Sequence, residues 1–127
     1  MVVNGSGSAD SRFDPKTLAE FLEMAGADLR RVLICQVRDD LGRYHDALVS
    51  ALACPEPERD MQALCKTAHE TKGLAATIGA VTLAELAKQV EHACQCQDIA
   101  ELTRLLAPLA QETAETGAAL SNLLSAD

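Results

Sequence analysis

The centre of the sequence carries the stretch Ala68-His69-Glu70-Thr71-Lys72-Gly73-Leu74-Ala75-Ala76-Thr77-Ile78-Gly79-Ala80. It continues a stripe of mostly apolar or small residues spaced three or four positions apart, namely Met61, Leu64, Ala68, Thr71, Ala75 and Ile78. Such spacing places the stripe on one face of a helix and is typical of packed antiparallel bundles. The pattern predicts a helix from about Glu58 to Ile78, closed by Gly79.

His69 lies off this stripe. Because each helical residue turns the chain by about 100°, His69 falls on the outer flank of the helix rather than in the core. Lys72 and Gly73 follow it by three and four residues, so both are its neighbours on the helix surface. A mid-helix glycine costs roughly 1 kcal/mol relative to alanine. At Gly73 it leaves free space over the histidine ring, and Ala76 keeps the surface low one turn further on.

Upstream of this stretch, the sequence predicts two helices. Asp14 and Pro15 are a favourable N-cap and first helical residue, and Gly26 is placed to end this short helix. Asp28 then predicts the start of a long second helix, which must end at the proline-rich segment after residue 53. Its expected core stripe is Leu29, Val32, Leu33, Val37, Leu41, Tyr44, Leu48 and Leu52.

Downstream, two capping signals predict two more helices. Thr82 and Glu85 form a capping-box pattern, and Asp98 with Glu101 forms a similar one. Pro108 lies inside the last helix and is expected to bend it, with a break near Pro108 as the alternative. The core stripe expected for this helix is Leu102, Leu106, Leu109, Thr113, Thr116, Leu120 and Leu123.

These elements predict an all-α fold. Apolar residues make up 48% of the 127 residues, and they are mostly Ala and Leu, the strongest helix formers. Short loops make consecutive helices antiparallel, so we expect an antiparallel up-down four-helix bundle with a short extra N-terminal helix capping one end. Residues 1–12 are expected to be a flexible arm, residues 13–124 the bundle domain and residues 125–127 a tail. The chain's own start and short tail favour a freestanding protein.

The charge and cysteine content exclude several classes of function. A net charge of −8 without basic runs argues against nucleic acid or an anionic membrane as partner. No apolar run reaches the roughly 20 residues that a membrane span needs. Five cysteines without framework spacing, and no export signal, favour reduced thiols in the cytoplasm. We expect a cytoplasmic monomer.

The pattern His-x-x-Lys-Gly at residues 69–73, followed by Ile78-Gly79-Ala80, resembles the active helix of histidine-containing phosphotransfer (HPt) domains. The resemblance spans about residues 13–124. It implies that His69 is the phosphoacceptor through Nε2, that Lys72 stabilises the phosphoryl group and that Gly73 provides steric access. One departure is Glu70, where the family commonly has a neutral residue; because it points to another face, we expect little effect.

The resemblance implies a phosphorelay carrier. His69 would accept a phosphoryl group from a receiver-domain aspartyl phosphate, as in a hybrid histidine kinase, and pass it to the aspartate of a response regulator. Imidazole suits this role because it is partly neutral near pH 7 and has a lone pair for attack. The chain would be a stoichiometric phosphocarrier without a kinase domain, and not an enzyme. It would need no cofactor of its own, because any divalent metal is expected on the receiver partner.

Supporting residues and alternatives stay open at the level of sequence. The family often has a polar side chain on the following helix near the histidine, and Gln89 and Glu91 are the two candidates. Lys66, three residues before His69, is a second candidate cation. The main alternative is a non-catalytic helical-bundle module that binds a receiver or kinase without phosphotransfer.

A metal or thiol enzyme is disfavoured. Cys94 and Cys96 with His92 suggest a metal site, but helical positions two apart face opposite sides, so both thiols cannot reach one ion. Cys65, one turn before His69, lacks an orienting group and is better explained as a partly buried thiol. His45 and His92 are interpreted as isolated surface residues.

Overall fold

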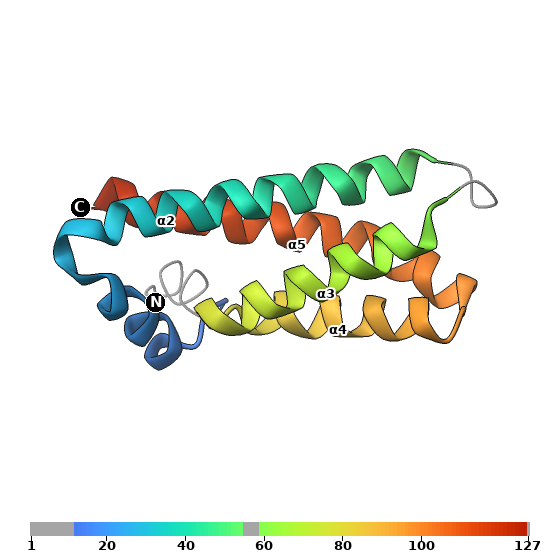
Figure 1. Cartoon of the computed structure of the whole chain (residues 1–127), viewed down its shortest axis with the longest axis horizontal. Coiled ribbons are helices and arrows are strands. Elements are labelled where there is room, and N and C mark those ends of the chain that lie inside the picture. The colour runs from blue at the N-terminus through green and yellow to red at the C-terminus, as the bar shows by residue number, and fades with distance from the viewer. Residues whose placement is uncertain (1–11, 55–58, 127) are drawn as a thin grey trace, which may run out of the picture.

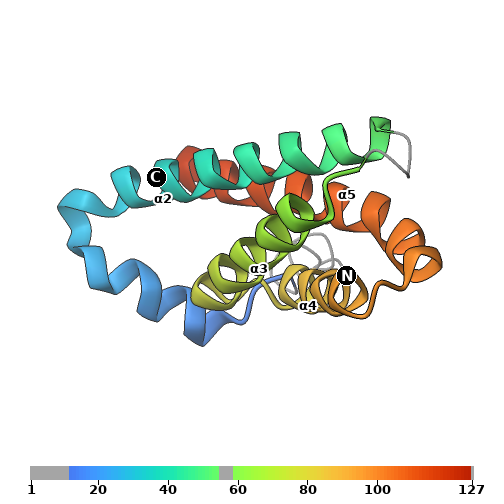
Figure 2. The same ribbon diagram turned by 45° about the vertical axis from the view of Figure 1, so that its right-hand side comes forward.

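The structure is a computed structural model that describes residues 12–54 and 59–126. It contains four helices: α2 (Pro15–Ala53), α3 (Met61–Ile78), α4 (Val81–Gln95) and α5 (Ile99–Ala126). Two views show α2 beside α5 and α3 beside α4, with consecutive helices running in opposite directions (Figures 1 and 2). The prediction of an all-α four-helix bundle is confirmed.

The short N-terminal helix that we expected is not seen as an element of its own. Residues 15–53 form the single helix α2, but Gly26 inside it has a φ of 78° and a ψ of 169°. This left-handed φ is readily adopted only by glycine, and it redirects the chain. The part of α2 before Gly26 folds back toward the turn between α3 and α4 (Figure 1, blue), so the boundary predicted at Gly26 appears as a kink.

The core face predicted for α2 is partly wrong. Leu29 and Val32 are exposed, and Ile34 is fully buried instead. Val32 lies two residues before Ile34, which turns it by about 200° to the opposite side of the helix. Leu52, in the last turn of α2, is also exposed. The remaining expected residues are buried or packed against the core: Leu33, Val37, Leu41, Tyr44 and Leu48.

The turn between α3 and α4 is held by the N-terminal segment. Gly79 has a φ of 77°, and a Cβ atom there would lie 2.9 Å from Cβ of Thr17, so only glycine fits without a shift. The amide of Asp14 donates to the Gly79 carbonyl at 2.7 Å, and the amide of Val81 donates to the Arg12 carbonyl at 3.2 Å. Phe13 forms an isolated antiparallel bridge with Ala80.

This arrangement changes how α4 begins. We expected a capping box at Thr82, but α4 starts at Val81 after Ala80, which provides no side-chain cap. The Arg12 carbonyl instead satisfies one of the free amides at this helix end. The capping signal predicted at Asp98 for the start of α5 is confirmed, because the amide of Glu101 donates to Oδ1 of Asp98 at 3.2 Å.

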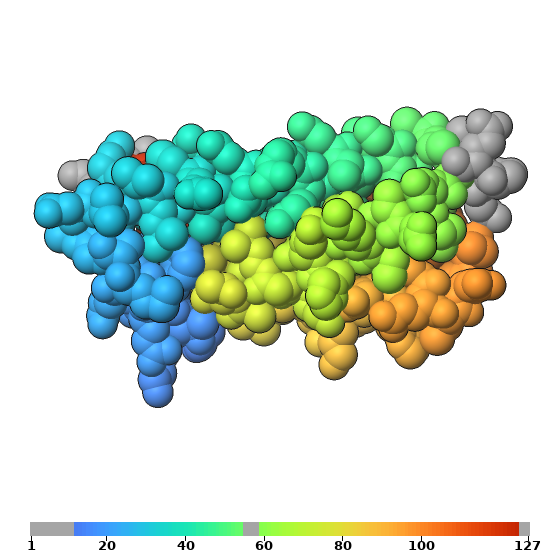
Figure 3. Space-filling view, in the orientation of Figure 1, coloured from blue at the N-terminus to red at the C-terminus, as the bar shows by residue number. Residues whose placement is uncertain are grey.

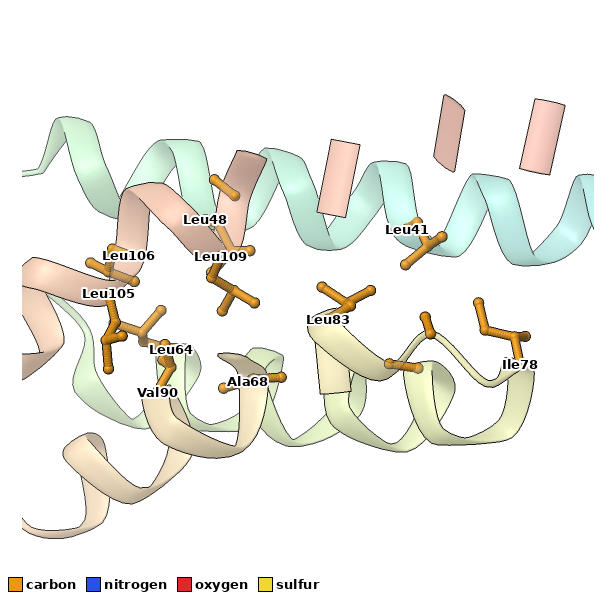
Figure 4. Close-up of a cluster of buried hydrophobic side chains, with 14 of the residues drawn as sticks. Leu41, Leu48, Leu64, Ala68, Ile78, Leu83, Val90, Leu105, Leu106 and Leu109 are labelled. Carbon is orange, nitrogen blue, oxygen red and sulfur yellow. The ribbon is translucent and has the colours of Figure 1, made fainter. Parts of the chain in front are cut away.

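The core runs along the centre of the bundle and contains the stripes predicted for α3 and α5. Figure 4 shows leucines of α2, α3, α4 and α5 converging on it. The buried threonines Thr71 and Thr113 each donate to a carbonyl one turn earlier at 2.7 Å, so their hydroxyls are satisfied inside an apolar core. α5 continues without interruption through Pro108, so it is a single helix and the alternative of a break does not occur.

Several expectations fall at or beyond the edges of the described residues. Residues 1–11, within the expected arm, and the prolines at 55 and 57 lie outside them. Arg12 is described and is held by ion pairs to Glu112 and Glu115 on α5, each at 2.8 Å. The start predicted for α3 at Glu58 also lies outside, while Asp60 caps the observed helix through the Ala63 amide. No described helix has the length and apolarity that crossing a bilayer requires.

Candidate functional site

The helix pair α3 and α4 presents His69 to the solvent. The seam residues Leu64, Ala68 and Thr71 are buried, which turns the flank of α3 carrying His69 outward. Figure 3 shows that α3 (green to yellow) is uncovered across the middle of one face of the molecule. The side chain of His69 is 66% exposed, so an approaching group can reach its ring.

Glu91 on α4 fixes one side of that ring. Nδ1 of His69 lies 2.7 Å from Oε2 of Glu91. An ionised carboxylate can only accept hydrogen bonds, so Nδ1 carries the proton and donates it. In the neutral ring, Nε2 then keeps its lone pair. The contact therefore selects the tautomer that nucleophilic attack through Nε2 requires.

The same carboxylate binds Lys72. Nζ of Lys72 lies 2.6 Å from Oε1 of Glu91, whose side chain is only 12% exposed. The charged hydrogen bond from Lys72 lowers the pKa of Glu91, burial opposes this shift, and the hydrogen bond from His69 supports it. Glu91 is thus held ionised between two bases, and it fixes the positions of both.

The other residues proposed from the sequence lie around this group. A Cβ atom built on Gly73 would have no heavy-atom neighbour within 4 Å, so the surface there is open. Ala76 is exposed one turn further along, and Lys66 is exposed one turn before His69. Gln89 does not reach the histidine; its Nε2 donates to Oε2 of Glu85 at 3.1 Å. Of the two α4 candidates, the structure brings only Glu91 to His69.

The pairing of Glu91 with Lys72 was missed from the sequence. The three-residue spacing on α3 places Lys72 beside His69 on the helix surface. This spacing does not show that one carboxylate contacts both side chains. A signal was nevertheless present. Glu91 follows Ala87 by four residues and precedes Cys94 by three, so it lies on the same side of α4 as these small buried residues, where a carboxylate is buried at a cost unless a cation meets it. A charged residue beside the seam therefore points to a partner on the facing helix.

The thiols do not form a metal centre with the nearby histidine. Cys94 is buried and Cys96 is exposed, in agreement with the predicted opposite orientations. Burial, followed by the neighbouring Cys65, raises the pKa of the Cys94 thiol to about 11, which leaves it protonated at neutral pH. Sγ of Cys96 lies 3.6 Å from Nε2 of His92. Within residues 12–54 and 59–126, no three His, Cys, Asp or Glu side chains are grouped to hold a metal ion.

Comparison with known protein families identifies the family of this chain. The sequence model of the Hpt domain matches residues 17–126, which include all four helices except the first residues of α2. Searches of the curated proteins and of the solved structures found no match. The matched region covers most of the chain and contains His69, Glu91 and Lys72 together, and the chain therefore belongs to the Hpt domain family.

Proposed function

We propose that His69 accepts a phosphoryl group from an aspartyl phosphate on a receiver domain and transfers it to the aspartate of a response regulator. The main support for this proposal is the contact between Nδ1 of His69 and Glu91, which leaves Nε2 as the free nucleophile on an exposed ring. Membership of the Hpt domain family supports phosphotransfer as the class of activity. The donor, the acceptor and the direction of transfer belong to the proposal.

The site itself supplies the nucleophile for this reaction, and the receiver supplies the phosphoryl group. The Nε2 lone pair attacks phosphorus, an N–P bond forms, and the P–O bond to the aspartyl group breaks so that its carboxylate leaves. The ring gains positive charge in this step, which the Glu91 carboxylate stabilises at Nδ1. Lys72 lies beside the same carboxylate and is placed to offset charge on the phosphoryl oxygens. Transfer to the next aspartate is the reverse sequence.

The partners follow from this reaction. A receiver domain of a hybrid histidine kinase would deliver the phosphoryl group, and a response regulator would receive it, with any divalent metal held by the receiver. The open surface over Gly73 and Ala76 supports close approach of such a domain. The chain itself would act as a stoichiometric carrier in the cytoplasm.

Phosphotransfer is tested by incubating the protein with receiver domains charged by acetyl phosphate. We expect label that is acid-labile and base-stable, as for phosphohistidine. The variant His69→Gln should take none, whereas His45→Gln should be labelled like wild type. Equal labelling of His69→Gln would overturn the assignment. Receiver binding without any label would favour the non-catalytic interaction module.

A further inference from the structure

Lys88 on α4 is a cation beside the site without a partner of its own. It is exposed, and within the described part of the chain its side chain makes no ion pair or hydrogen bond. Lys72 differs, since its ammonium is already 2.6 Å from the Glu91 carboxylate. Of the two lysines, Lys88 is therefore the one whose charge is not neutralised inside the molecule.

The register of the helices places Lys88 level with Lys72. α3 and α4 run antiparallel, and the contact between His69 and Glu91 aligns them. Lys88 precedes Glu91 by three residues, just as Lys72 follows His69 by three. Both therefore lie about one turn, roughly 4.5 Å of helix rise, toward the turn between the two helices.

Two surface recesses meet at these lysines. One, of about 620 Å³, extends along α4 past Glu91 and Gln89. The other, of about 650 Å³, runs toward the turn between α3 and α4 and has a floor of small residues that includes Ala76. Both recesses are lined by Lys72, Lys88 and Glu85. Lys66 lines neither, so Lys88 is the better placed second cation.

The charge distribution indicates what this edge recognises. The chain has a net charge of −8, yet α3 and α4 together are formally neutral, because their three lysines, Lys66, Lys72 and Lys88, balance three carboxylates, Glu70, Glu85 and Glu91. A partner that exchanges phosphate through an aspartate with the help of a divalent metal carries further carboxylates to bind that metal. Two acidic surfaces repel each other, so an acidic partner docks most favourably where the chain is least acidic and a cation is left unpaired.

We propose that Lys88 is a docking residue that recognises the acidic surface of the phosphoryl partner. This inference rests on the proposed function. Lys88 contacts the partner and not the reacting phosphorus, because its side chain tilts toward the α4 N-terminus and away from His69. Glu85, which lines the same recesses, weakens the same attraction. Lys88 and Glu85 together set how fast an acidic partner associates.

The test measures the second-order rate of transfer from a receiver domain that labels the wild-type chain. Lys88→Gln should slow transfer about tenfold at about 20 mM salt, and the difference should shrink at about 500 mM salt as charges are screened. Lys88→Arg should restore the rate, and Glu85→Gln should raise it. Arg31→Gln makes the same change in net charge on α2, where the exposed Arg31 donates to the Leu124 carbonyl of α5, and should have no effect.

Direct labelling with phosphoramidate, a small donor that needs no docking, separates recognition from chemistry. Lys88→Gln should be labelled at the wild-type rate by this donor. Equal slowing with both donors, or wild-type transfer from the receiver at low salt, would overturn the docking role. These outcomes differ from failure of the proposed function, in which the wild-type chain takes no label on His69.

Discussion

Two charge clusters in this molecule have opposite arrangements. On the face of α3 and α4, one carboxylate, Glu91, lies between two bases, His69 and Lys72, at 2.7 and 2.6 Å. Near the start of α2, one guanidinium, Arg12, lies between two carboxylates on α5, both at 2.8 Å. Each cluster joins segments that are distant in sequence.

The exposed members of each cluster explain why only one is a candidate reaction site. The first keeps its anion buried and places an imidazole with a free nitrogen at the surface. In the second, the guanidinium of Arg12 donates to two carboxylates. The backbone carbonyl of Arg12 accepts a hydrogen bond from the Val81 amide. Arg12 therefore fastens the N-terminal segment to α4 and α5. A charge cluster becomes a candidate site for phosphotransfer where it leaves a nucleophile accessible.

Removing the central anion of the first cluster should have the largest effect. Glu91→Ala frees the His69 ring and loses the selected tautomer, so the rate of transfer from a phosphorylated receiver should fall about 100-fold. Glu91→Gln keeps an oxygen that accepts from Nδ1 and should be less impaired. Rapid-quench labelling measures both rates. Wild-type transfer by a folded Glu91→Ala protein would show that the contact plays no part.

The substitution Gly73→Ala, which fills the space over His69, should raise the stability of the fold while lowering the rate of transfer. Apart from the adjoining backbone of α3 itself, no heavy atom of the described residues would lie within 4 Å of a new Cβ atom there, so Gly73→Ala should stabilise the fold by up to about 1 kcal/mol. Transfer from the receiver should nevertheless fall about tenfold, because the methyl group obstructs docking. Denaturant unfolding and labelling measure the two effects.

Gly42 on α2 provides a matched control for that substitution. It is also a mid-helix glycine, and apart from the adjoining backbone of α2 an added Cβ would meet no described heavy atom within 4 Å. Gly42→Ala should give a similar gain in stability with an unchanged rate of transfer. Loss of transfer in both variants would attribute the effect to helix stiffness rather than to the surface over His69.

Features that depend on contacts within one helix could be predicted from the sequence, whereas features that depend on contacts between helices could not. Residues of one helix are related by a fixed rotation, so the α3 stripe and the exposure of His69 were both predictable. The face of α2 was harder, because the turn at Gly26 and contacts with other helices decide that Ile34 rather than Val32 is buried. Pairing across helices, as between Glu91 and Lys72, depends on the register of α3 against α4, which no local pattern specifies.

Breaking the second cluster should cost stability without affecting transfer. Arg12→Ala removes two partly exposed ion pairs, so we expect a loss of about 1 kcal/mol and a Tm lower by several degrees. Arg43→Ala is the control, since that guanidinium is well exposed and makes only an ion pair with Asp40 on its own helix and a distant contact over the Tyr44 ring among the described residues; its Tm should not change measurably. A large loss of transfer in Arg12→Ala would instead couple the N-terminal segment to the site.

The smallest expected effect is a pH dependence that belongs to Glu91. Hydrogen bonding from Lys72 lowers the pKa of Glu91 in the folded protein, so the folded state binds this proton less readily than the unfolded chain. The resulting stabilisation is fully present above the ordinary glutamate pKa and is lost as the pH falls through the lowered value. Unfolding in urea at several pH values should therefore show the advantage of wild type over Glu91→Gln shrinking toward low pH. Lys72→Met removes the main cause of the shift and should reduce this dependence as well. An advantage that stays constant down to pH values below that window would mean that Glu91 acts by packing rather than by its charge.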